Sequence, residues 1–217
     1  MDVMALIDGP AAAIVFGGTA VATLLRCGWG DVATTARVLA TLGETHFDAD
    51  RVRAEVAVQL QDIARDGLLR AQLHSFGDAE FDEATGALLE QRSVKALVER
   101  HEAHRRRRLA LSHAAARTLA QAAELAPVFG LAGTLISLSQ LPAEGIASGN
   151  FAGAISLAVL TTLYGLLFAN LLLAPLARMV DRKAQDEEAE RQALFDWIAA
   201  QVEAQQPVRR PAEARAA

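Results

Sequence analysis

The sequence predicts an all-α membrane protein with three transmembrane helices and long cytoplasmic helical extensions. None of its 21 lysines and arginines lies within residues 1–25 or 127–177. Those two intervals hold nearly all of the three longest apolar runs, which are Pro10–Leu25, Leu125–Leu141 and Phe151–Ala177. A spanning helix needs about 20 mostly apolar residues, and basic residues collect in cytoplasmic segments. The pattern therefore predicts both the number of spans and their orientation.

The N-terminal run supplies the first span. It reaches full length only when Met4–Gly9 is added, which puts Asp8 near the outer surface. A cleaved signal peptide is the alternative for this segment, but such a peptide begins with a positively charged region. The first ten residues carry Asp2 and Asp8 and no basic side chain, so a retained span is favoured.

The second and third runs form a transmembrane hairpin, joined by the short connection Pro142–Asn150. A soluble helical protein with buried hairpins is disfavoured, because Phe151–Ala177 has no charged side chain, whereas a soluble helix normally keeps a polar stripe. Placing the basic residues inside makes the N-terminus periplasmic and the C-terminus cytoplasmic. The four predicted regions are residues 1–25 (N-terminus and first span), 26–124 (cytoplasmic helices), 125–177 (the hairpin) and 178–217 (a cytoplasmic amphipathic helix and a disordered tail).

The cytoplasmic segments are predicted to be helical. Apolar residues recur at helical spacing in 31–42, 50–73 and 181–205, whereas the acidic cluster 78–83 indicates a loop. A long helix is expected to start near Thr85 and to continue towards the second span.

Two clusters in this region are interpreted as ordinary surface features. The run Arg105–Arg108 is expected to be a solvated helix face that helps to set the topology. His101 and His104 have a spacing that metal ligands sometimes use, but no cysteine or carboxylate geometry accompanies them, so no metal site is predicted.

Spans two and three contain no carboxylate, although intramembrane carboxylates usually mark proton relays. Their polar content consists of hydroxyl and small side chains. Thr134 and Thr162 are functional candidates, because a hydroxyl lines a narrow polar path without the cost of a buried charge; plain packing is the alternative. Small residues at three- and four-residue spacing predict close helix packing: Gly130, Gly133, Ala158, Gly165 and Ala169.

Pro127 and Pro175 lie at the predicted cytoplasmic ends of these two spans. They indicate either a helix start and a helix kink or a pair of hinges at one membrane level. No Gly-rich phosphate loop, nucleophile elbow or zinc motif occurs in the sequence, so neither an enzyme nor a bound cofactor is predicted.

Three segments of the chain resemble the MotA/TolQ/ExbB proton-channel family. They are "IDGPAAAIVFGGTAVATLL" (Ile7–Leu25), "APVFGLAGTLISL" (Ala126–Leu138) and "AISLAVLTTLYGLLFANLLLAPLA" (Ala154–Ala177). The resemblance implies a bacterial inner-membrane protein that forms a pentamer around a dimer of a single-span MotB/ExbD/TolR-like partner. Each partner helix would carry one membrane aspartate. The transported ion would be a proton, with sodium as the alternative.

The resemblance also assigns roles to residues. Thr134 and Thr162 match positions whose hydroxyls line the family's pore, and Thr161, beside Thr162, is taken as a third pore-lining candidate. Pro127 and Pro175 match two prolines linked to torque coupling in MotA.

Some features of the sequence resemble the ExbB/TolQ branch of the family, and others resemble the MotA branch. Three spans with an outer N-terminus resemble ExbB and TolQ, but Leu157 stands where those proteins carry a glutamate, which favours a MotA-type flagellar stator. Arg65 and Arg70 are candidate rotor contacts, although Gln72 replaces the acidic partner that MotA uses. We therefore expect a stator subunit of a rotary motor driven by the proton-motive force. The alternatives are an ExbB/TolQ-like energiser of outer-membrane transport or envelope integrity, and a non-conducting membrane scaffold.

Overall fold

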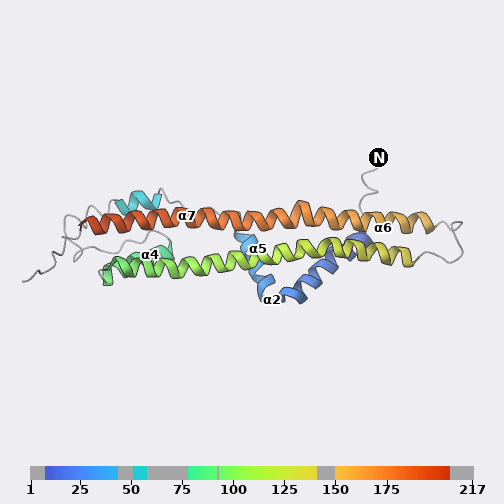
Figure 1. The fold of residues 1–217 in the computed structure, drawn as a ribbon, viewed down its shortest axis with the longest axis horizontal. Coiled ribbons are helices and arrows are strands. Elements are labelled where there is room, and N and C mark those ends of the chain that lie inside the picture. The colour runs from blue at the N-terminus through green and yellow to red at the C-terminus, as the bar shows by residue number, and fades with distance from the viewer. Residues whose placement is uncertain (1–7, 44–50, 58–77, 92, 141–149, 206–217) are drawn as a thin grey trace, which may run out of the picture. The chain divides into compact units, whose positions relative to one another are not determined.

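The protein is all-α over the part that the computed structural model describes, which is residues 8–43, 51–57, 78–91, 93–140 and 150–205. Three helical stretches are long and apolar enough to cross a membrane: Gly9–Thr41, Val94–Ser139 and Phe151–Val202. Each contains one of the predicted apolar runs or nearly all of it, so the predicted fold class is confirmed. Figure 1 shows the helices in chain order.

The chain divides into two compact units. The first, here called the hairpin unit, comprises Met1–Glu44 and Ala110–Ala184. The second, the α4 unit, comprises Thr45–Leu109 and Gln185–Ala217. Two long helices, α5 (Val94–Ser139) and α7 (Ala174–Gln205), contribute residues to both units.

The hairpin unit begins with a helix that changes geometry twice. It comprises α1 (Gly9–Ala12), the π-helical turn η2 (Ala13–Gly17) and α2 (Gly18–Thr41). Asp8 starts it, because its Oδ1 accepts the Ala11 N–H at 2.8 Å. Gly28 interrupts α2 with φ 82° and ψ 162°, a conformation that glycine adopts readily and other residues rarely do.

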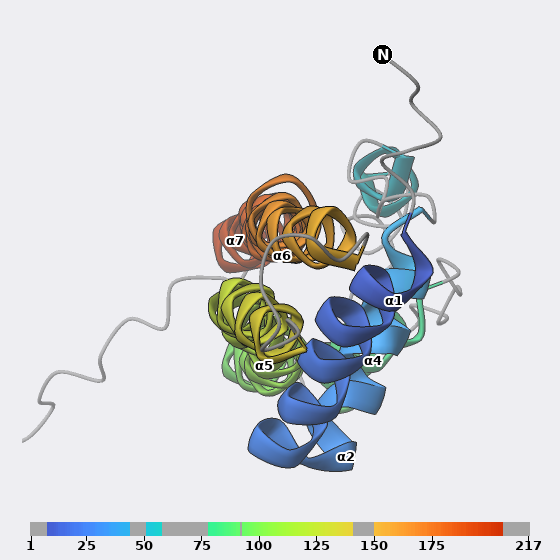
Figure 2. The same cartoon turned by 90° about the vertical axis from the view of Figure 1, so that its right-hand side faces the viewer.

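The remaining helices of this unit are α5 as far as Ser139, α6 (Asn150–Leu167), the π-helical turn η3 (Phe168–Leu173) and the first part of α7. Figures 1 and 2 both show α6 beside the final turns of α5, as the predicted hairpin requires. Small side chains dominate the shared core, which consists of Ala115, Leu119, Ala122, Ala126, Ala169, Leu173, Ala177 and Val180. Val38 and Leu39 of α2, together with Leu42 directly after it, pack against this core.

Pro127 lies inside α5 and does not start a helix, which corrects one reading of the sequence. A proline in a helix interior removes one backbone hydrogen bond. Here close packing against α6 opposes that cost, since Ala126 is fully buried and a Cβ on Gly165 would lie only 3.2 Å from the Pro127 Cα. Pro175 is the second residue of α7 and directly follows the η3 turn.

The α4 unit differs from its predicted layout at the acidic cluster. The cluster forms the first turn of α4 (Ala79–Gln91) and is not a loop, because the Oδ1 of Asp78 accepts the N–H groups of Glu80 and Phe81 at 3.0 Å. The long helix predicted from Thr85 is instead two helices, because α4 ends at Gln91 and α5 begins at Val94. Residues 51–57 are helical, and the rest of the predicted helix 50–73 lies outside the described residues.

The core of the α4 unit confirms the predicted apolar face of the C-terminal helix. Leu194, Phe195, Ile198 and Val202 of α7 are all buried there. They pack with residues from the other elements of the unit, namely Val52, Val56, Phe81, Ala84, Leu88 and Leu97.

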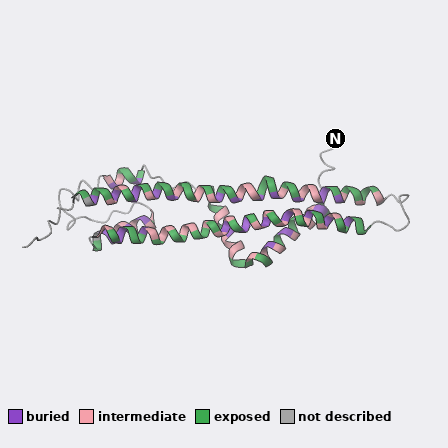
Figure 3. Ribbon diagram, in the orientation of Figure 1, coloured by how far each residue is buried: buried purple, intermediate pink, exposed green. Residues whose placement is uncertain are grey.

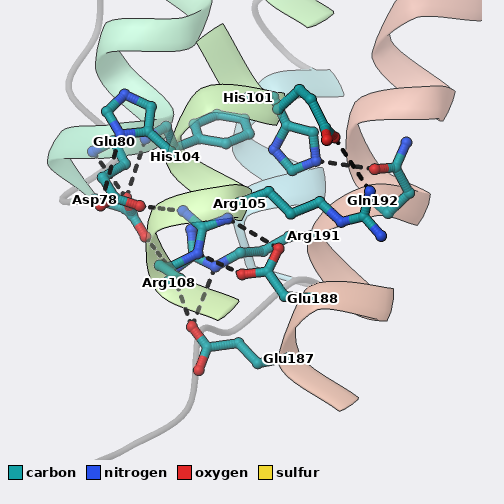
Figure 4. Close-up of polar contacts among 12 residues, drawn as sticks. Asp78, Glu80, His101, His104, Arg105, Arg108, Glu187, Glu188, Arg191 and Gln192 are labelled. Carbon is teal, nitrogen blue, oxygen red and sulfur yellow. Dashed lines mark hydrogen bonds and ion pairs between the residues drawn. The ribbon is translucent and has the colours of Figure 1, made fainter. Parts of the chain in front are cut away.

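Two arginines, Arg108 (half-buried) and Arg191 (buried), tie α4 and α5 to α7 in this unit (Figure 4). Arg108 binds Glu188 and Glu80, and Arg191 lies 2.6 Å from Asp78. The predicted solvated face is therefore wrong for Arg108, whose side chain is only 20% exposed, while that of Arg106 is 78% exposed. The carboxylates that accept Arg108 lie far from it in the sequence, so the arginine run alone gave no sign of this pairing.

These contacts shift two acid–base equilibria. Burial raises the pKa of Asp78, but the Arg191 guanidinium and the N–H groups of Phe81 and Glu80 together lower it by more. The net pKa of Asp78 therefore lies below its usual value. Burial lowers the pKa of Arg108, yet the hydrogen bond and charge of Glu188 outweigh it and the net pKa is raised. Asp78 and Arg108 are therefore both charged at neutral pH.

His101 is buried and takes part in packing. Its ring stacks on Phe195 with centroids 4.0 Å apart, and its Nε2 lies 3.0 Å from Gln192 Oε1. Burial lowers the pKa of His101, which favours the neutral ring. Because Gln192 offers an oxygen there, we assign the ring proton to Nε2.

Candidate functional site

The predicted small residues bring the backbones of α5 and α6 into contact. A Cβ built on Gly130 would lie 2.9 Å from the Thr161 carbonyl oxygen, and one on Gly165 would lie 2.7 Å from the Ala126 oxygen. A Cβ on Gly133 would lie 2.7 Å from the Thr161 side chain. These distances are too short for real side chains, so glycine at the three positions permits the close approach.

Three threonine hydroxyls meet beside these glycines. The Oγ1 of Thr134 lies 2.7 Å from that of Thr162 and 3.5 Å from that of Thr161. It also lies 3.1 Å from two carbonyl oxygens, those of Gly130 and Ala158. The predicted pair Thr134 and Thr162 is therefore in direct contact, although the two residues come from different helices.

The carbonyl acceptors around Thr134 favour one direction for the hydrogen bond between Thr134 and Thr162. A hydroxyl donates one proton and accepts two, and the carbonyls of Gly130 and Ala158 can only accept. If the Thr134 proton goes to a carbonyl, Thr162 donates to Thr134. The Oγ1 of Thr162 then keeps its lone pairs as acceptors for a further donor.

The three hydroxyls differ in accessibility. Thr161 is completely buried, and its Oγ1 donates to the Ala158 oxygen at 3.0 Å. Thr134 and Thr162 are half-buried. Thr161 therefore packs inside the hairpin and does not line a surface of this chain, whereas the other two hydroxyls reach its edge. Figure 3 shows exposed stretches along both α5 and α6.

The other predicted site residues fall into two groups. Ala158 and Ala169 are buried, as expected for packing positions. Arg65 and Arg70 lie outside the described residues. In the described part of the chain, no three His, Cys, Asp or Glu side chains gather as metal ligands would.

Sequence reasoning missed several polar contacts of the hairpin unit. The Tyr164 hydroxyl accepts the Asp8 N–H at 3.1 Å, and the fully buried Ser137 donates to the Gly133 oxygen at 2.7 Å. The Cys27 thiol donates to Gln121 Oε1 at 2.9 Å. Asn170, the only carboxamide between Phe151 and Ala177, was also overlooked, and its isolation in an apolar run was the available signal.

The arrangement supplies polar oxygens but no carboxylate. Within 125–140 and 150–177 of the structure, hydroxyls and backbone carbonyls can accept hydrogen bonds from water or a hydrated ion, but no carboxylate can carry a proton there. A proton carrier must therefore come from outside this hairpin if protons cross here.

Comparison with known proteins gives consistent results. The sequence profile described as the MotA/TolQ/ExbB proton channel family matches residues 61–193, which is more than half of the chain. Motility protein A from Cereibacter sphaeroides is 26% identical over 208 residues, covering 88% of this chain and 76% of that protein. The uncharacterized protein YtxD from Bacillus subtilis is 30% identical over 154 residues, covering 69% of this chain and 52% of YtxD.

Two solved structures are similar to this fold. In the flagellar MotAB stator complex from Bacillus subtilis, a chain aligns with a TM-score of 0.83 and 20% identity, covering 94% of this chain and 81% of that one. In MotAB from C. jejuni, the TM-score is 0.77 with 18% identity, covering 98% of this chain and 89% of that one. At these identities the similarity concerns the fold.

Proposed function

The chain belongs to the MotA/TolQ/ExbB proton channel family, and from that premise we propose that it is the channel-forming stator subunit of a flagellar motor. The observation that carries this proposal is the Thr134–Thr162 hydroxyl contact between two apolar spans that contain no carboxylate. Similarity to Motility protein A and to chains of two MotAB complexes supports the flagellar branch.

In the proposed mechanism, a partner protein supplies the proton carrier. A single-span MotB-like helix brings a membrane carboxylate next to the hydroxyls of Thr134 and Thr162. A proton arrives at that carboxylate from the periplasm, passes the two hydroxyls and leaves on the cytoplasmic side. Each elementary charge that crosses provides about 2.3 kcal/mol per 100 mV of membrane potential.

The assembly follows from the same proposal. Several copies of this chain, a pentamer by resemblance, surround a dimer of the single-span partner. The N-terminus is periplasmic and the C-terminus cytoplasmic, because Arg178, Arg182 and Lys183 follow the third span, whereas residues 1–25 contain no basic side chain. The helices of the α4 unit then lie in the cytoplasm, where they pass the motion to a rotor. Arg65 and Arg70 remain candidates for that contact.

The test is ion flux through the complex of this chain with its partner, reconstituted in vesicles. A potassium diffusion potential drives protons, and an internal pH-sensitive dye reports them. Thr134→Val is expected to lower the flux at least tenfold, the factor that 1.4 kcal/mol represents. The same assay with sodium outside the vesicles and a sodium-sensitive dye inside them tests whether sodium is the transported ion.

A matched control exists on the same helix. The hydroxyl of Thr118, like that of Thr134, donates to the carbonyl four residues earlier, at 3.0 Å and 3.1 Å respectively. Thr118→Val removes the same chemical group away from the cluster, so its flux should match that of the unchanged protein. Equal flux in Thr134→Val, Thr162→Val and the control would refute the proposed ion path and favour a scaffold.

A further inference from the structure

Asn170 is a polar residue on an exposed and otherwise apolar surface of the third apolar helix. It is exposed, as are its neighbours Leu171 and Leu172. Its Nδ2 donates to the Leu166 carbonyl at 2.9 Å. No hydrogen-bond donor among the described residues reaches its Oδ1, which is therefore available as an acceptor. A carboxamide in an apolar span ordinarily pairs with another helix or with water, because lipid cannot satisfy it.

The π-helical turn η3 determines which face of the helix carries Asn170. The residues buried against α5 recur at every fourth position: Thr161, Gly165, Ala169, Leu173 and Ala177. In a regular α-helix each step of four residues advances by about 40°, so this row would rotate by about 160° from its first to its last member. One extra residue in the η3 turn removes about 100° of that rotation. The buried row therefore remains on one face.

The same argument applies to the adjacent row, one position later in sequence. Thr162, Leu166, Asn170 and Ala174 share the four-residue spacing and flank the buried row. Asn170 thus lies on the helix face that Thr162 begins, eight residues or about 12 Å along the axis. The hydrogen bond from Asn170 to Leu166 joins two members of this row and holds the carboxamide along it.

We propose that Asn170 is a second polar station of the ion path, on the α7 side of the threonine pair, where its Oδ1 accepts a hydrogen bond from a water molecule that carries the proton onward. This inference rests on the proposed function. The face that it shares with Thr162 and the acceptor that it leaves unused favour water over lipid as its neighbour. No bond of the carboxamide is made or broken, because the group only orients water.

The flux assay described above tests this station. Asn170→Leu removes the carboxamide while keeping the branched shape of the side chain and is expected to lower proton flux about tenfold. Asn170→Gln keeps the group and is expected to retain most of the flux. The exchange Asn170→Leu with Leu171→Asn preserves composition but moves the carboxamide by about 100° around the helix, so its flux should stay low. Full flux in the exchange variant would overturn the proposal, since position would then be irrelevant.

A labelling experiment separates water contact from effects on folding. In a Cys27→Ser background, Asn170→Cys in the complex should react with a small water-soluble thiol reagent, whereas Leu171→Cys, on the neighbouring face, should not. Equal reactivity of the two, or no reaction at the first, would contradict a water-lined position.

Thr162→Val, measured in parallel, keeps the two proposals distinguishable. If it abolishes flux while Asn170→Leu does not, the second station is wrong and the proposed function stands. If neither variant changes flux, both proposals fail.

Discussion

Replacing Arg191 by methionine is expected to lower the free energy of unfolding of the α4 unit by about 3 kcal/mol. The Arg191 side chain is only 9% exposed and neutralises Asp78 and Glu187, which lie 2.6 Å and 3.1 Å away. Removing one partner of a buried ion pair costs about 3–5 kcal/mol, because the other charge stays buried. We place the effect at the lower end, since the side chains of Asp78 and Glu187 are 20% and 27% exposed.

Urea unfolding of the intact complex measures this effect through tryptophan fluorescence. The chain has two tryptophans, and Trp197 packs against the core of the α4 unit with Arg53 5.1 Å from its ring centre. In a Trp29→Phe background, the emission of Trp197 therefore reports this unit. Arg106→Met is the control, because Arg106 is exposed and its ion pair with Glu102 is solvated, so the urea midpoint should not move.

A double-mutant cycle and a pH series sharpen the result. Adding Asp78→Asn to Arg191→Met should cost less than the sum of the single changes, because the two residues contact each other. The pKa of Asp78 is below its usual value, so the contribution of the pair is complete above about pH 4 and is lost as the pH falls through the folded-state pKa. Equal losses in Arg191→Met and Arg106→Met would refute the argument that burial makes this pair strong.

Three further predictions concern other parts of the chain. Gly165→Val should abolish assembly of the complex on size-exclusion chromatography, because its Cβ would meet the Ala126 carbonyl, whereas Gly153→Ala, which has open space, should assemble normally. Burial lowers the pKa of His101, so the folded protein binds fewer protons than the unfolded chain. The contribution of His101 to stability should be complete above about pH 6.5 and should fall as the pH drops towards the folded-state pKa. In His101→Gln, urea midpoints measured between about pH 7 and pH 5 should therefore depend less on pH. Gly28→Ala should lower thermal stability by about 1 kcal/mol because of its positive φ, whereas Gly30→Ala should not; circular dichroism melting curves that coincide would contradict this.

The sequence was most informative where one physical rule dominates. The exclusion of charge from lipid located the apolar helices, and the spacing of small residues predicted the close approach of α5 and α6. The apolar period of 181–205 likewise identified the buried face of α7. In each case the signal lies within one continuous segment.

Features that depend on distant partners were not predictable from local patterns. Arg108 is half-buried and pairs with Glu80 and Glu188 from other helices, and the charge run around it gave no indication of this. Asp78 belongs to an acidic cluster typical of loops, yet its side chain caps α4 and pairs with Arg191. The η3 turn also escaped prediction, because its apolar residues suit an α-helix equally well.

The division of the chain has a consequence for the order of synthesis. Each unit combines an early and a late segment of the chain. The hairpin unit needs Ala110–Ala184 to be complete, and the α4 unit needs Gln185–Ala217. While the ribosome is still translating the hairpin, Phe81 and Leu88 of α4 have no Leu194 or Phe195 to cover them, and Asp78 has no Arg191. The α4 unit therefore acquires its core only when the last helix leaves the ribosome, and a nascent chain stalled before that point would expose this apolar surface to chaperones and proteases.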